Sequence, residues 1–163
     1  MSDNFLRFIP EDVNSCRKLS LQETTQIKAL LEPYKSWDLS WNDISVCESE
    51  KIFFADAGEN FESVSCPFCD QSLERWWGDA MSAACNEDQN NFECLDVTTP
   101  CCNKTTSLHD LNYYFNQGFY KTIVEIANPS FSEGLTAQEH AEIIEKELFR
   151  ITECRWRIIF ARL

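Results

Sequence analysis

The sequence has little basic charge. Its 14 Lys and Arg stand against 27 Asp and Glu among 163 residues, which gives a formal net charge of −13. Proteins that bind nucleic acid gain affinity by neutralising phosphates with Lys and Arg, so this balance argues against direct contact with DNA or RNA. Anionic membrane surfaces are disfavoured for the same reason. We expect a basic protein partner, because opposite charges steer association; an acidic surface that only maintains solubility is the alternative.

Long hydrophobic runs are also absent. No stretch of about 18 or more apolar residues occurs, which excludes a transmembrane helix. The opening segment MSDNFLRFIPEDV has neither a basic n-region nor a long apolar h-region, so no secretory signal is expected. We therefore predict a cytoplasmic protein. In such a reducing compartment, clustered cysteines hold metal more often than they form disulfides.

The remaining composition is that of a folded domain. The chain is 44% hydrophobic and has only 4 Gly and 5 Pro, so it has enough apolar surface for a sizeable core. Its length favours one domain spanning residues 1–163.

The hydrophobic pattern predicts an α+β fold, in which a mixed or antiparallel sheet is covered by helices. Helices are expected after Ser20, over residues 73–85 and over residues 136–150, the first and last with capping-box spacing. Residues 119–129 and 154–163 read as strands, and with the intervening helix they can form a β-α-β unit. Residues 43–56 read as two short strands around a polar turn, and residues 108–115 as a short helix.

Nine cysteines are many for this length, and two groups of them are close in sequence. They stand at Cys16, Cys47, Cys66, Cys69, Cys85, Cys94, Cys101, Cys102 and Cys154. Cys66-Pro67-Phe68-Cys69 is a C-x-x-C segment, whose tight turn can bring two thiolates to one side of a Zn²⁺ ion. The intervening aromatic residue can shield such a site from water. We expect zinc knuckles at about residues 64–72 and 99–109, inserted into the α+β fold as a zinc-ribbon-like site.

The second half of this site is less regular than the first. Cys101 and Cys102 are adjacent rather than spaced by two residues, and adjacent side chains tend to point apart. The leading set of metal ligands for a structural Zn²⁺ is Cys66, Cys69, Cys101 and Cys102. His109 in place of one of the adjacent pair is the alternative ligand, and Cys85 and Cys94 are further candidates.

A thiol-redox reading uses the same first pair. In thioredoxin-type motifs, C-x-x-C lies at a helix N-terminus, where the helix dipole lowers the thiol pKa. The helix expected from residue 73 makes this geometry conceivable for Cys66 and Cys69. It leaves Cys101 and Cys102 unexplained, whereas a metal site explains all four.

Several segments resemble those of small uncharacterised bacterial proteins that contain zinc ribbons. They are FADAGENFESVSCPFC, WWGDAM, FECLDVTTPCC, SLHDLNYYF and GFYKTIVEIANP, within residues 50–130. The resemblance implies Cys66, Cys69 and the Cys101–Cys102 turn as metal ligands and implies no catalytic residue. Stand-alone acidic bacterial proteins of this size are also similar to the immunity proteins of toxin systems.

The sequence thus predicts a non-enzymatic, acidic protein-binding module with a structural zinc site. Residues 1–100 carry 19 acidic and 7 basic side chains, whereas residues 101–163 carry 8 and 7, so the docking face is expected within residues 43–100. The sharpest form of this hypothesis is an immunity protein that neutralises a basic toxin. The alternative is a thiol-redox or metal-dependent enzyme that uses Cys66 and Cys69.

Overall fold

The computed structural model describes residues 2–15, 17–37 and 44–163. Its main sheet contains β1 (Asn4–Pro10), β2 (Ile44–Ala55), β4 (Cys85–Asn86), β5 (Asn91–Phe92), β9 (Gly118–Ala127) and β10 (Trp156–Arg162). The strand order is β10-β1-β9-β2-β5-β4, and every neighbouring pair is antiparallel. The predicted α+β class with an antiparallel sheet is confirmed.

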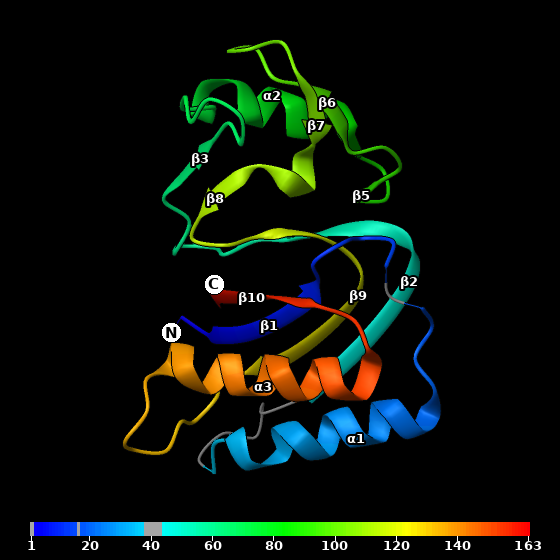
Figure 1. Cartoon of the computed structure of the whole chain (residues 1–163), viewed down its shortest axis with the longest axis vertical. Helices are drawn as coiled ribbons and strands as arrows, with labels where there is room; N and C mark the ends of the chain where they lie inside the picture. Colours follow the sequence, from blue (N-terminus) through cyan, green and yellow to red (C-terminus); the bar gives the residue numbers. More distant parts are fainter. Residues whose placement is uncertain (1, 16, 38–43) are drawn as a thin grey trace.

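Two helices cover one face of this sheet. They are α1 (Leu21–Leu31) and α3 (Ala137–Thr152), which lie side by side in Figure 1. Between them and the sheet lies a buried core that includes Ile27, Val124 and Leu148. Both helices begin with the predicted capping boxes, at Ser20 with Glu23 and at Thr136 with Glu139.

The order β10-β1-β9-β2, with one helix after β1 and one after β9, is the split β-α-β or ferredoxin-like arrangement. β9 and β10 are both antiparallel to β1 and are therefore parallel to each other, as the predicted β-α-β unit allowed. Because β1 lies between them, the unit is split. The chain ends also meet, since Asp3 and Leu163 exchange two backbone hydrogen bonds of 2.9 and 3.0 Å.

Residues 56–117, between β2 and β9, form an inserted region that makes the upper part of Figure 1. It contains α2 (Glu74–Ala84), the strand pairs β3 (Ser63–Ser65) with β8 (Asn112–Tyr114) and β6 (Asp96–Thr98) with β7 (Thr105–Ser107), and the short strands β4 and β5. A second apolar core, with Val64, Leu73 and Leu108, fills this region and reaches the sheet at Phe119. Trp77 is half-buried and packs against that core, and its indole N–H donates to the Tyr113 hydroxyl at 3.1 Å.

The hairpin predicted within residues 43–56 is wrong. Ile44–Ala55 is one strand, β2, whose two ends pair with the same partner, β9, on either side of a register shift between Glu48 and Phe53. The polar stretch that looked like a turn is this irregularity, with a local bond from the Lys51 N–H to the Ser49 hydroxyl of 3.0 Å. β9 is 10 residues long and can pair with both apolar runs.

The helix predicted for residues 108–115 is also wrong in extent. Ser107 does accept a capping bond from the His109 N–H, but the helix that follows is the single 3-10 turn η2 (Leu108–Asp110). The chain then enters β8, because Tyr113 and its neighbours pair with β3. A further 3-10 turn, η1 (Glu32–Tyr34), follows α1 and contains Pro33.

Candidate metal centre

Two turns of the inserted region bring four cysteine thiols together. The sulfurs of Cys66, Cys69, Cys101 and Cys102 all lie within 4.8 Å of one another. The Sγ–Sγ distances are 3.6 Å for Cys66–Cys102, 3.3 Å for Cys69–Cys101 and 4.0 Å for Cys101–Cys102. Four thiolates bound at about 2.3 Å to one tetrahedral ion lie about 3.8 Å apart, so the cluster has the dimensions of a four-sulfur metal site. These separations far exceed the roughly 2.05 Å of a disulfide.

The first turn follows β3 and contains the C-x-x-C segment. The Cys66 N–H donates to the Gln71 carbonyl at 2.9 Å, and the Asp70 N–H donates to the Cys66 carbonyl at 3.0 Å. Asp70 has a positive φ of 63°, which closes the turn. The Phe68 N–H points at the Cys66 sulfur, 3.4 Å away. Such N–H groups stabilise a thiolate, as expected of a metal knuckle.

The second turn joins β6 to β7. The Thr99 N–H donates to the Lys104 carbonyl at 2.9 Å, and the Asn103 N–H donates to the Thr99 carbonyl at 2.9 Å. Asn103 has a positive φ of 56°. Within this turn the adjacent Cys101 and Cys102 both direct their sulfurs to the cluster, an arrangement that spacing alone argued against.

The cluster is buried on one side and open on the other. Cys66 is fully buried and Cys102 half-buried, both against the core of the inserted region, whereas Cys69 and Cys101 are exposed. Phe68 lies near the open side with the Lys104 ammonium 5.1 Å from its ring centre.

The surroundings give the thiols different pKa values. Burial raises the pKa of Cys66, but the N–H groups of Phe68 and Cys69 and the Cys101 and Cys102 thiols outweigh burial and lower that pKa to about 6. Desolvation, followed by hydrogen bonds to the other three thiols, raises the pKa of Cys101 to about 12. Cys66 therefore ionises readily, whereas burial and the neighbouring thiols oppose ionisation of Cys101. A bound dication removes that opposition, which is the electrostatic condition for a metal site.

His109, the alternative ligand, is not part of the cluster. Its Nδ1 accepts the Phe119 N–H at 2.9 Å, and its Nε2 lies 2.7 Å from the Glu11 carbonyl. An accepting Nδ1 requires the tautomer in which Nε2 carries the proton and donates. Burial, with the nearby Arg157 charge, lowers the pKa of His109. Its ring thus links the inserted region to the segment after β1, and both nitrogens are already engaged.

The other proposed ligands also lie elsewhere. Cys85 is half-buried beside the core of the inserted region, and Cys94 is exposed. Neither belongs to the four-thiol group. α2 begins at Glu74, beyond the turn that carries Cys66 and Cys69, so this pair does not lie at a helix N-terminus.

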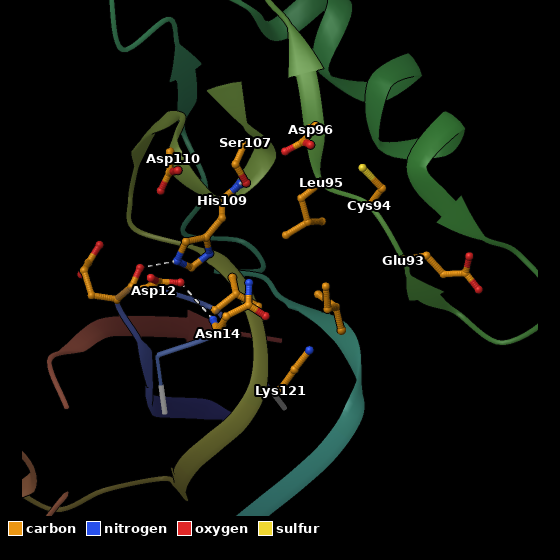
Figure 2. A pocket seen from close by; sticks show the side chains of 13 residues that line it. Asp12, Asn14, Glu93, Cys94, Leu95, Asp96, Ser107, His109, Asp110 and Lys121 are labelled. Atoms are coloured by element: carbon orange, nitrogen blue, oxygen red, sulfur yellow. Dashed lines mark hydrogen bonds between the residues drawn. The ribbon is translucent and has the colours of Figure 1, made fainter. Parts of the chain in front are cut away.

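An acidic pocket of about 540 Å³ lies between the inserted region and the main sheet (Figure 2). Asp96 and Asp110 lie above the His109 ring in that view, with Asp12 and Lys121 below it. The carboxylates that line the pocket are those of Glu11, Asp12, Glu93, Asp96 and Asp110. Asp96 and Asp110 form no ion pair among the described residues, so their charges are available to a ligand or partner.

The sequence reasoning missed part of this pocket. Glu11, Asp12 and Asp110 lie outside residues 43–100, where the acidic face was expected. No local sequence pattern indicates that these residues are close, because the segments that follow β1 and β7 come together only in the folded molecule.

Comparison with known proteins found no matching family model, no similar curated protein and no similar solved structure. The resemblance to zinc-ribbon-containing proteins therefore stays a prediction. What the structure supports is its central feature, the four clustered cysteines. No helix among the described residues is long and apolar enough to span a membrane.

Proposed function

We propose that this protein is a non-enzymatic, acidic protein-binding module whose inserted region is stabilised by a structural Zn²⁺ ion. The observation that carries the metal assignment is the group of four thiols within 4.8 Å. Four thiolates and tetrahedral spacing favour Zn²⁺, with iron as the other metal of such sites. All four ligand positions are protein sulfurs, as in closed structural sites rather than catalytic ones, which keep one position open.

The proposed ion stabilises the fold by joining two separate turns. Cys66 and Cys69 follow β3, whereas Cys101 and Cys102 lie between β6 and β7, about 30 residues further along the chain. The strands beside them are only 3 residues long and form two-stranded pairs, which are weak alone. A metal bound to both turns would hold these strand pairs together, as a larger hydrophobic core does in other proteins.

Metal analysis tests this assignment. We expect about one zinc per chain in protein purified without chelator. Cys66→Ser and Cys102→Ser should contain less zinc, because three thiolates hold the ion more weakly than four. Cys47→Ser is the matched control, because Cys47 is an exposed thiol on β2 outside the cluster. Zinc content unchanged by the two cluster substitutions, or absent from the unaltered protein, would overturn the metal proposal.

The proposed partner is a basic protein, and charge supports it. Residues 48–96 carry 12 acidic side chains against Lys51 and Arg75. The pocket adds Glu11, Asp12 and Asp110 to this acidic surface. The sharpest form of the proposal is an immunity protein that covers the active site of a basic toxin, for instance a nuclease, and presents carboxylates where phosphates would bind.

Binding to the product of the adjacent gene tests the partner proposal. We expect Asp96→Asn with Asp110→Asn to weaken the complex by about 10-fold at moderate salt, since neither carboxylate forms an ion pair with any residue that the structure describes. Glu133→Gln with Glu142→Gln removes the same net charge from exposed positions before and on α3, and should leave affinity nearly unchanged. Equal effects of the two double variants, or no complex with that gene product, would count against this partner.

A further inference from the structure

The two cysteine turns have the same backbone architecture, although only one has the C-x-x-C spacing. Residues 66–70 read CPFCD and residues 99–103 read TPCCN. In each turn the first residue donates its N–H to the carbonyl of the sixth, at 2.9 Å in both. The fifth donates to the carbonyl of the first, at 3.0 and 2.9 Å, and has a positive φ of 63° or 56°. Proline stands second in both.

This equivalence assigns each residue of the second turn a counterpart in the first. Cys102 corresponds to Cys69, and Thr99 corresponds to Cys66. Cys101 corresponds to Phe68, a position that carries no ligand in the first turn. The apparent irregularity of the adjacent cysteines is thus a single shift, in which the first thiol of the second turn stands at position 101 instead of 99.

Thr99 itself faces the cluster. Like Cys66 it has 0% exposure, and its Oγ1 lies 3.2 Å from the Cys102 sulfur. The same oxygen lies 3.2 Å from the Lys104 carbonyl and accepts the Lys104 N–H at 3.3 Å. When Cys102 is a metal-bound thiolate its sulfur can only accept, so the hydroxyl proton of Thr99 turns from the Lys104 carbonyl to that sulfur.

We propose that Thr99 occupies the displaced ligand position of a paired-turn metal centre and is a positioning residue for Cys102. Resting on the proposed metal site, this assignment gives Thr99 a role that no metal-ligand pattern in the sequence records. The hydroxyl orients the Cys102 thiolate and supports its charge, while Cys101 completes the tetrahedron from the exposed side. Outer hydrogen bonds of this kind typically change metal affinity by about 10- to 100-fold.

Moving the ligand tests the equivalence directly. The probe is Co²⁺, whose thiolate charge-transfer absorption reports the number of bound sulfurs, followed by competition with Zn²⁺. We expect Cys101→Ser to lose about one quarter of the absorption, since three thiolates remain of four. Adding Thr99→Cys to Cys101→Ser creates CPSCN in the second turn. This double variant should restore the full absorption and bind Zn²⁺ more tightly than Cys101→Ser alone. An absorption that stays at the level of Cys101→Ser overturns the inference.

The role of the Thr99 hydroxyl is tested in variants that keep all four cysteines. Thr99→Val, which keeps the shape of the side chain, should weaken Zn²⁺ binding by about 10- to 100-fold and shift the Co²⁺ charge-transfer band. Thr99→Ser, which keeps the hydroxyl, should retain both. Equal Zn²⁺ affinity in Thr99→Val and the unaltered protein overturns the positioning role. If Thr99→Val fails to fold, the double variant with Thr99→Cys and Cys101→Ser tests whether position 99 is a ligand position.

These outcomes separate the inference from the proposed function on which it rests. An unaltered protein that binds neither Co²⁺ nor Zn²⁺ refutes the metal site itself. An unaltered protein with the absorption of four thiolates, beside a double variant that recovers nothing, refutes only the equivalence of the turns.

Discussion

At the scale of single residues, the chain separates its two kinds of metal-binding side chain. The four thiols form a cluster, whereas both ring nitrogens of His109 are hydrogen-bonded to backbone groups. The Phe119 N–H and the Glu11 carbonyl hold its ring from two directions. Gly118 makes this approach possible, because a Cβ there would lie 2.9 Å from the His109 Nδ1. A histidine near a cysteine cluster is therefore a weak indicator of ligation when both its nitrogens have backbone partners.

The state of His109 predicts a pH dependence of stability. Its pKa in the folded protein is lowered by burial and by Arg157, from an unfolded value of about 6.5. Between the two pKa values the unfolded chain binds the proton and the folded chain does not, so the free energy of unfolding falls as pH drops below about 6.5. Denaturant unfolding at pH 7 and 5 measures this loss, and the His109→Gln variant should lack that component. A ring titration by NMR with a midpoint at or above 6.5 would contradict it.

At the scale of elements, the four-thiol cluster depends on turns more than on helices or strands. Both turns end in a residue with positive φ, Asp70 and Asn103, at the point where the backbone bond back to the first residue forms. Asn and Asp tolerate this conformation because their short polar side chains have local partners, and a β-branched residue does not.

Asn103 offers a test of this dependence. We expect Asn103→Val to destabilise the second turn by about 1–2 kcal/mol and to weaken metal binding, since φ would still have to be positive. Asn103→Gly is the matched control, because glycine adopts this φ freely and the side chain is exposed. The free energy of unfolding, measured in the presence of metal, compares the stability of the two variants. Equal stability of the two would show that the turn does not require the left-handed conformation.

At the scale of the whole molecule, the two largest apolar cores of the described residues lie in different parts of the fold. The helices α1 and α3 bury one core against the ferredoxin-like sheet, and the inserted region has its own core beside the four thiols. Such sheets host many unrelated functions, so function is argued from the inserted site and the acidic surface. The acidic pocket lies where the two parts meet, with carboxylates from both (Figure 2).

Removal of metal should therefore act unevenly on the molecule. We expect a chelator to increase amide hydrogen exchange in residues 63–107, because the two turns would lose the proposed ion that joins them. β1, β9 and β10 should stay protected by the core beneath α1 and α3. Hydrogen exchange by mass spectrometry measures this, and the chelated Cys47→Ser variant should behave like the unaltered protein. A uniform increase across the chain would show that the metal stabilises the fold as one unit.

The sequence by itself determined the elements whose signals are local. The capping boxes at Ser20 and Thr136, the period of α2 and α3 and the β-rich run of β9 all predicted elements that the structure contains. The C-x-x-C spacing and the adjacent Cys101 and Cys102 also predict that these four cysteines share one site. In the structure their sulfurs do lie together.

Only the tertiary structure decided what depends on pairing across the chain. β2 is one strand because β9 is long enough to pair with both of its halves. β1 lies between β9 and β10 and pairs with both of them. Cys66 and Cys69 share one site with Cys101 and Cys102 only because two turns far apart in the sequence lie together in the fold. These outcomes follow from hydrogen bonds between distant segments, which a local pattern does not contain, since each segment acquires its conformation from the partner beside it.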